Sequence, residues 1–308
     1  MRRAHAPAVP GLFLAAVLLA GCGPADEAGD APAPAEGVVE VAARDFEFDA
    51  PETLRPGWTT FRFTNLGEQE HFFYVYRLPD DVTYGQFRRE AMGPFGRVWN
   101  DYASGRLSRE EAGQAFAEAL PEWFFTGLVP SGGPALTEPG TTATSTVRLE
   151  PGTYVVECYV KTPQGTYHTE RGMQRELTVA GEPTGAEPPE ADAELALSNY
   201  EIAVSGDLSA GKRTVAVRVE EDPGGMMLHD VNLFRLEDGV TVDEIVAWMD
   251  WMDLEGFRAP APGTSLGGMD HLAAGRTGFV TVELTPGRYA WVSEAYGARG
   301  MTRAFTVE

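Results

Sequence analysis

Apolar and polar residues alternate along several short segments of the chain. Phe61 and Phe63 alternate with polar neighbours in the first half, and Val215, Val217 and Val219 alternate with other residues in the second half. Successive side chains of a strand point to opposite faces, so this period of two is typical of half-buried strands. Pro-Gly turns separate such segments in both halves. The pattern predicts an all-β chain built from antiparallel β-sandwiches.

The two halves of the chain repeat the same motifs in the same order. The matched pairs are His71–Leu78 with His229–Leu236, Val147–Tyr154 with Val282–Tyr289, and Gly172-Met173 with Gly300-Met301. Ordered self-similarity of this kind indicates copies of one structural unit. We therefore expect two tandem sandwiches.

Helix-start sequences predict a helical insertion in each half. Thr83, Ser108 and Thr241 are each followed three residues later by Gln or Glu, which is the capping-box pattern. We expect helices from Ser108 through about Leu120 and, from the spacing of apolar residues, over 242–252. The aromatic residues of the first insertion are expected to pack against the sandwich and not to line a ligand pocket. They are Trp99, Tyr102, Trp123, Phe124 and Phe125.

Segments of different composition divide the chain. Residues 1–22 combine a basic start, an apolar run too short for a stable transmembrane helix, and Leu-Ala-Gly-Cys. This resembles a bacterial lipoprotein signal peptide with its lipobox, in which Cys22 is lipidated. Residues 23–37 and 181–194 are rich in Ala, Pro, Gly and acid, so we expect a disordered tether and a linker. The expected domains are 38–180 and 195–308.

The charge balance is strongly acidic. The chain has 46 acidic and 24 basic residues, and its formal net charge is −22. Nucleic-acid binding is therefore not expected. The sequence also lacks a Ser-His-Asp order, a phosphate-binding loop and zinc-site spacing.

One stretch, Tyr154–Met173, carries the main chemical signal. It is predicted to begin as a strand that carries Cys158 and to continue through a turn-rich loop to His168 and Met173. Thiolate, imidazole and thioether together suit copper, and a site of two His and one Cys with a weak axial Met is the blue-copper arrangement. His71, far upstream, could supply the second imidazole.

The cysteine count adds to this signal. The chain has only two cysteines, Cys22 and Cys158. If Cys22 carries lipid, Cys158 has no partner within the chain. A lone thiol in an oxidising compartment is explained by metal ligation or, alternatively, as a buried inert cysteine.

The order of these residues resembles that of the cupredoxins, the family of plastocyanin, azurin and the copper domains of multicopper enzymes. The matching residues are Asn65-Leu-Gly-Glu-Gln-Glu-His71, Cys158, His168 and Met173. The resemblance implies Greek-key β-sandwiches and one type 1 copper ion in the first half. Asn65 and Glu70 are candidates for holding the His71 loop. Nine residues separate Cys158 from His168, a gap longer than in the small electron carriers of the family and close to that of its nitrite reductases.

The second half lacks the ligand set. Ser293 stands where the first half has Cys158, and the loop 294–300 contains no His. His229 and Met301 remain at matching positions. The second domain is therefore expected to be copper-free. His271 stands opposite a leucine of the first half and receives no predicted role.

These features favour a membrane-tethered electron carrier of the cell envelope, facing the periplasm or the exterior, with an unknown redox protein as partner. An enzyme is not expected, because Glu157 and Tyr159 flank Cys158 where a catalytic second copper centre needs histidine. One alternative is a copper-free cupredoxin-like binding or structural module. The other is a copper storage or delivery protein, since thiolate and thioether also suit Cu(I).

Overall fold

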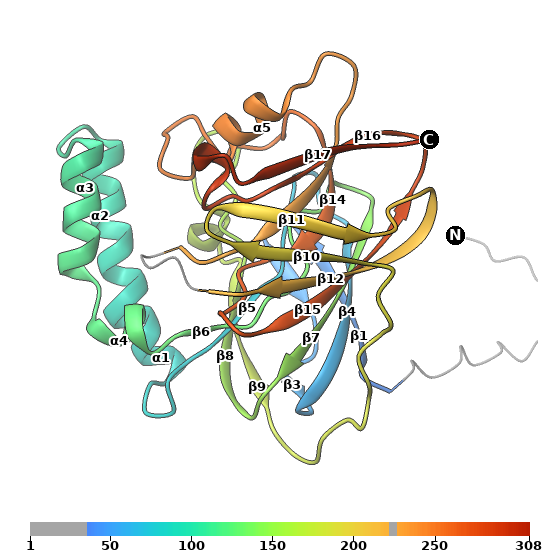
Figure 1. The fold of residues 1–308 in the computed structure, drawn as a ribbon. Coiled ribbons are helices and arrows are strands. Elements are labelled where there is room, and N and C mark those ends of the chain that lie inside the picture. The colour runs from blue at the N-terminus through green and yellow to red at the C-terminus, as the bar shows by residue number, and fades with distance from the viewer. Residues whose placement is uncertain (1–35, 222–226) are drawn as a thin grey trace, which may run out of the picture. The chain divides into compact units, whose positions relative to one another are not determined.

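Strands dominate the computed structural model, which describes residues 36–221 and 227–308 (Figure 1). The predicted signal peptide 1–22, its Cys22 and the tether through residue 35 lie outside the described residues. Within the described part of the chain, no helix combines the length and the apolar character that crossing a bilayer requires.

The first half forms two β-layers with a shared core. One layer contains β2 (Glu47–Asp49), β1 (Val38–Arg44), β4 (Gly57–Asn65) and β7 (Thr142–Leu149). The other is a five-stranded sheet in the order β3 (Thr53–Leu54), β9 (Gln174–Val179), β8 (Gly152–Glu157), β5 (Tyr74–Arg77) and β6 (Val129–Pro130). Phe61 and Phe63 of β4 and Val156 of β8 belong to the same buried cluster, so both layers contribute to one core.

The second half repeats this arrangement. One layer contains β11 (Glu201–Gly206), β10 (Ala193–Ser198), β12 (Gly211–Val219) and β15 (Thr277–Leu284). The other is a four-stranded sheet in the order β14 (Thr264–Met269), β13 (Val231–Arg235), β16 (Gly287–Val292) and β17 (Thr302–Val307).

A single eight-stranded sheet runs through both halves. Strands β7 and β15 pair antiparallel, with Ser145 opposite Val280, and this pairing joins the two four-stranded layers. The division into domains at 38–180 and 195–308 therefore stays a prediction, since one continuous layer serves both.

The all-β fold class with helical insertions is confirmed. Phe61, Phe63, Val215 and Val217 are fully buried, as their alternation predicts. Most strand pairs are antiparallel, but β1 pairs parallel to β4 and β10 pairs parallel to β12. Strand β1 has its antiparallel partner β2 on one edge and its parallel partner β4 on the other. Strand β10 lies between β11 and β12 in the same way.

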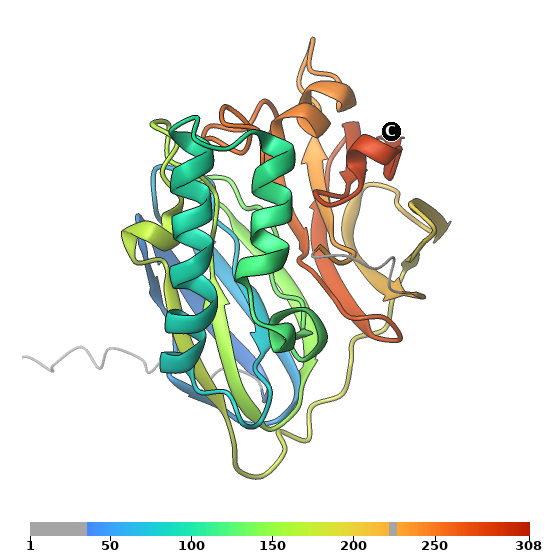
Figure 2. The same cartoon turned by 90° about the vertical axis from the view of Figure 1, so that its left-hand side faces the viewer.

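The first insertion is the larger one. It comprises α1 (Tyr84–Phe87), the π-helical turn η1 (Arg88–Met92), α2 (Gly93–Ala103), α3 (Arg109–Ala119) and α4 (Glu122–Thr126). Figure 2 shows α2 and α3 side by side. The predicted capping boxes at Ser108 and Thr241 are both present.

The second insertion is shorter than predicted. Helix α5 spans Val242–Trp248, whereas the apolar spacing predicted a helix over 242–252. The carbonyls of Trp251 and Asp253, just beyond the helix, accept hydrogen bonds from the ammonium of Lys161, each at 2.7 Å. The helix ends here because the Trp248 carbonyl, which a longer helix would pair with Met252 N–H, accepts from Phe257 N–H, while Met252 N–H donates to Asp250 Oδ1.

Lys161 joins the two halves close to the stretch that holds Cys158. The side chain is fully buried, and its Nζ also donates to the carbonyl of Gly256 at 2.9 Å. The ammonium lies 4.8 Å from the ring centre of Trp99, within the range of a cation–π contact. A buried ammonium is tolerated here because three carbonyls and an aromatic face replace its water.

We expect Lys161→Met to lower the free energy of unfolding by about 3 kcal/mol, because buried carbonyls lose a charged donor while the aliphatic volume is kept. Urea denaturation of the full chain measures the change. The chain's other lysine, Lys212, is exposed, so Lys212→Met is the matched control and should change stability by less than about 0.5 kcal/mol. Equal effects of the two substitutions would contradict the bridging role.

Candidate metal centre

Cys158 lies immediately after β8, in the core of the first half. Its side chain is fully buried, and it is a free thiol. Its backbone N–H donates to the carbonyl of Met173 at 3.1 Å, so the two ends of the predicted ligand stretch are held together. Side chains continue to alternate between the two faces beyond Glu157, the last residue of β8, so Glu157 and Tyr159 lie on the face opposite Cys158.

The nine residues between Cys158 and His168 form a tight loop that is closed by backbone hydrogen bonds. Thr162 N–H donates to Thr166 O at 2.8 Å, and an antiparallel bridge pairs Lys161 with Tyr167. The chain then returns, because His168 N–H donates to Val160 O at 2.8 Å. A hairpin-like loop therefore places His168 beside Cys158 in spite of the nine intervening residues.

His71 reaches the same place from the loop after β4. Its backbone exchanges hydrogen bonds with Thr137, at 3.2 and 2.8 Å. As expected, Asn65 holds this loop: its Nδ2 donates to the carbonyls of Gln69 and Thr137, each at 2.8 Å, and its Oδ1 accepts from Gly67 N–H at 2.9 Å.

Glu70 also holds the His71 loop. Its Oε1 accepts a hydrogen bond from the backbone N–H of Ala261 at 2.8 Å. The bond ties the loop to the second half of the chain.

Three donor atoms converge. Cys158 Sγ lies 3.7 Å from His71 Nδ1 and 3.5 Å from His168 Nδ1, and the ligand atoms of the three residues all lie within 4.8 Å of one another. Metal–nitrogen and metal–sulfur bonds of about 2.0 and 2.3 Å at trigonal angles require about 3.7 Å between N and S. The spacing therefore fits a single metal ion held by all three.

The outer nitrogens of both imidazoles have hydrogen-bond partners. His71 Nε2 donates to Asp45 Oδ1 at 2.7 Å, and His168 Nε2 donates to Gln69 Oε1 at 3.2 Å. Gln69 Nε2 in turn donates to Asp45 Oδ2 at 3.4 Å. Because an Nε2–H bonded to an acceptor leaves a lone pair on Nδ1, both rings present the nitrogen that a metal needs toward Cys158.

Burial sets the protonation of the metal-free site. It lowers the pKa of His168 to about 3 and lowers the pKa of His71, for which the Asp45 hydrogen bond offsets part of the effect. Burial also raises the pKa of the Cys158 thiol well above its usual range. At neutral pH the site therefore contains two neutral imidazoles and a protonated thiol.

Close packing protects the hydrogen bond between Asp45 and His71. A Cβ at Gly67 would lie 2.8 Å from His71 Nε2 and would collide with the Asp45 carboxylate, so only glycine fits there. The Phe46 ring packs on His168 with 4.8 Å between ring centres.

Met173, the predicted axial ligand, is fully buried next to Cys158. Its N–H donates to His168 O at 3.0 Å, after Gly172 turns the chain with a positive φ of 109°. The predicted residues His71, Cys158, His168 and Met173 therefore occupy one region, and the structure brings the ligand atoms of the first three together.

The corresponding segment of the second half has the same backbone hydrogen bond but different side chains. Ser293 N–H donates to Met301 O at 3.1 Å, the counterpart of the bond between Cys158 and Met173. The Ser293 hydroxyl donates to the carboxylate of the buried Asp230 at 2.8 Å, and the Glu294 N–H donates to it at 3.0 Å. Asp230 follows His229, where the first half has Phe72. A carboxylate thus organises the loop here.

Asp45 and Gln69 were not predicted from the sequence. Asp45 lies in the turn between β1 and β2, 26 residues before its partner, and nothing in its spacing connects it to His71. The sequence could have indicated Gln69, because it stands two residues before His71 in the segment Asn65–His71.

No family model matches the chain, and no curated protein matches it either. Similar solved structures include dithionite-reduced auracyanin from the photosynthetic bacterium Roseiflexus castenholzii, with 23% identity over 48% of this chain and 100% of that chain and a TM-score of 0.26. Auracyanin A, a "blue" copper protein from Chloroflexus aurantiacus, matches with 20% identity over 46% and 98%, and a TM-score of 0.29.

A multicopper oxidase also matches, with 15% identity over 88% of both chains and a TM-score of 0.22. All these TM-scores lie below 0.5. The assignment of a metal therefore rests on the chain's own side chains.

We expect copper binding to release one proton per ion at pH 7.5, because the thiol must ionise while both imidazoles are already neutral. Affinity should then rise about tenfold per pH unit between pH 6.5 and 8.5. Calorimetric titration in buffers of different ionisation enthalpy counts the proton. Release of none, or of two or more, would contradict this protonation of the site.

Asp45→Ala removes the partner of His71 Nε2 and frees the ring to rotate. Copper affinity should fall by about 10- to 100-fold, as is usual when a hydrogen bond to a ligating imidazole is lost. Competition with a chromophoric copper chelator measures this. The control is Asp49→Ala, an exposed carboxylate on the neighbouring strand β2, which should leave affinity unchanged.

Proposed function

We propose that this chain is a type 1 copper protein, tethered to a membrane of the cell envelope, that carries single electrons. His71, Cys158 and His168 would hold one copper ion in the first half, and Met173 would be the fourth, weaker ligand. The observation that carries the proposal is the convergence of two Nδ1 lone pairs and one sulfur in a buried site.

The donor types select the metal. A thiolate with two imidazoles suits copper, whereas magnesium and calcium prefer oxygen ligands. When bound, copper alternates between two oxidation states and so holds or releases one electron. Asp45 and Gln69 keep the imidazoles in one orientation, and the bond between Cys158 and Met173 fixes the backbone. Ligands held in this way move little when the charge at the site changes.

Burial favours a carrier over a delivery protein. His71, Cys158 and His168 are all fully buried. An acceptor that takes over the metal must reach the ligand atoms, whereas an electron passes through the covering side chains. Copper storage or delivery would therefore require the covering loops to open.

The surroundings of Cys158 support an electron carrier over an enzyme. Glu157 and Tyr159 flank the cysteine, so no imidazole leads directly from it to a second centre. Among residues 36–221 and 227–308, the His71, Cys158 and His168 group is the only such cluster of His, Cys and acidic ligand atoms.

The location is proposed from the sequence. The lipobox ending in Cys22 would attach lipid, and the tether 23–37 would hold the domains away from the membrane. A redox protein is the proposed partner, and the second half is proposed to lack copper because Asp230 and Ser293 occupy its corresponding loop.

The test is copper reconstitution of the full chain, followed by visible and EPR spectra. We expect one ion per chain and an intense thiolate-to-copper charge-transfer band that Cys158→Ser abolishes. Cys22→Ser removes the chain's other cysteine and should leave the band intact. A colourless protein without stoichiometric copper would instead favour the copper-free binding module.

A further inference from the structure

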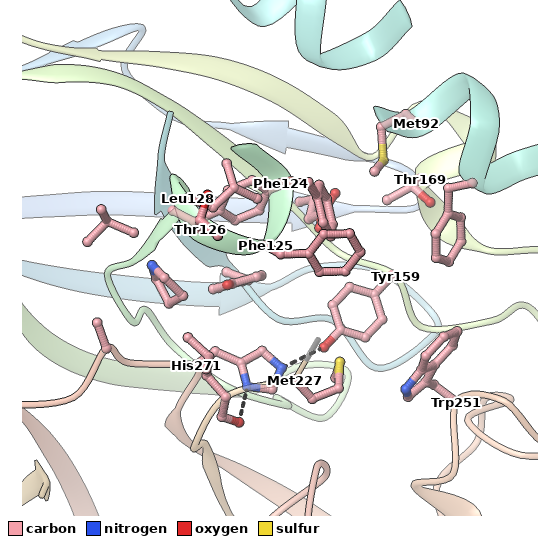
Figure 3. A pocket seen from close by; sticks show the side chains of 18 of the residues that line it. Met92, Phe124, Phe125, Thr126, Leu128, Tyr159, Thr169, Met227, Trp251 and His271 are labelled. Carbon is pink, nitrogen blue, oxygen red and sulfur yellow. Dashed lines mark hydrogen bonds between the residues drawn. The ribbon is translucent and has the colours of Figure 1, made fainter. Parts of the chain in front are cut away.

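A cavity of about 420 Å³, shown in Figure 3, is lined by Glu157 and Tyr159, the two neighbours of Cys158. The helical insertion of the first half forms one wall, through Met92, Phe124 and Phe125. The second half forms another, through Trp251 and His271. Phe124 packs against the buried cluster that includes Tyr76 and Val155, as predicted, and both Phe124 and Phe125 also line the cavity, which was not predicted.

The walls of the cavity are mainly aromatic. Aromatic faces and edges select flat rings, because offset and edge-to-face contacts add to the burial of apolar area. The volume suits a small organic molecule of two or three rings. Phe125 is 41% exposed, so part of the wall faces solvent. The aromatic lining residues are Tyr74, Tyr76, Phe95, Phe124, Phe125, Tyr159, Tyr167 and Trp251.

The polar side chains of the cavity wall are mainly hydroxyl groups. The Tyr159 hydroxyl stands in the middle of a hydrogen-bonded chain, because it lies 3.0 Å from Glu294 Oε2 as well as within hydrogen-bond distance of His271. His271 Nδ1 donates to Leu228 O at 2.9 Å, which leaves Nε2 as an acceptor 3.1 Å from the Tyr159 hydroxyl (Figure 3). The Glu157 carboxylate already accepts from Gln174 Nε2 at 2.6 Å. No lysine or arginine is among the lining residues.

The cavity and the metal centre lie back to back. Cys158 faces the metal ligands, while its neighbours Glu157 and Tyr159 line the cavity, because consecutive residues of an extended chain point to opposite sides. The two sites share a backbone segment and no side chain. The cavity is therefore a separate site.

We propose that this cavity binds a neutral aromatic molecule of two or three rings that carries a hydroxyl group. The rings occupy the space between Phe124, Phe125 and Trp251. The hydroxyl of the ligand donates a hydrogen bond to the remaining lone pair of the Tyr159 oxygen, whose own proton is already used within the Glu294–Tyr159–His271 chain. This assignment goes beyond electron transfer and does not require copper, since every contact comes from side chains outside the metal centre.

The test uses 2-naphthol as the probe on the copper-free full chain, with 2-methylnaphthalene as the analogue that lacks the hydroxyl. We expect saturable 1:1 binding of 2-naphthol in a fluorescence titration, at least tenfold tighter than binding of the analogue. A site that hydrogen-bonds a hydroxyl discriminates strongly against a ligand without it.

Ala273 lines the cavity, so Ala273→Trp should fill it and abolish binding. The control is Ala210→Trp, at an exposed position outside the cavity. Phe125→Ala removes a partly exposed wall and should weaken binding even if the Trp variant fails to fold. Tyr159→Phe removes the acceptor for the ligand hydroxyl and should erase the preference for 2-naphthol over 2-methylnaphthalene.

Absence of saturable binding would overturn the proposal. So would unchanged affinity in both Ala273→Trp and Phe125→Ala. An aromatic wall beside a carboxylate could instead select a cation. Tighter binding of phenyltrimethylammonium than of 2-naphthol would therefore overturn the neutral hydroxyl ligand.

Discussion

The hydrogen bonds to the outer nitrogens of His71 and His168 are the constraint on which the metal centre depends. Without Asp45 and Gln69, each imidazole ring could turn either of its nitrogens toward Cys158. The three side chains would then lie close together without a single arrangement of donor atoms. With them, both Nδ1 atoms face Cys158. The requirement extends to Gly67, because any side chain there would displace the Asp45 carboxylate.

The two halves show how one frame supports different chemistry. The bond between the residue after the strand and the methionine after the loop is 3.1 Å in both halves. In the first half this frame carries a thiol among imidazoles. In the second it carries Ser293, held by Asp230. Glu70 and Lys161 then tie the loops that carry His71 and His168 to the second half, so the second half contributes to the position of these side chains.

Local patterns predicted the strands, two of the three capping boxes and the residues of the candidate metal centre, because these depend on period, spacing and residue type; at Thr83 the Gln86 side chain bonds Glu90 instead. Asp45 could not be predicted, since its contact with His71 arises from tertiary packing of a distant turn. The end of α5 depends on a tertiary contact, because Phe257 N–H takes the Trp248 carbonyl. The cavity depends on the fit between the halves, since Phe124 and Phe125 meet Trp251 only in the folded chain. His271 had no sequence signal, yet it faces Tyr159.

The central claim is that two imidazole nitrogens and one sulfur bind a single copper ion. X-ray absorption fine structure of the copper-loaded full chain tests it most directly, because it counts the atoms around the metal. The account predicts two nitrogen scatterers near 2.0 Å and one sulfur near 2.3 Å, judged from zinc sites with the same donors. A copper ion surrounded only by nitrogen and oxygen would contradict it.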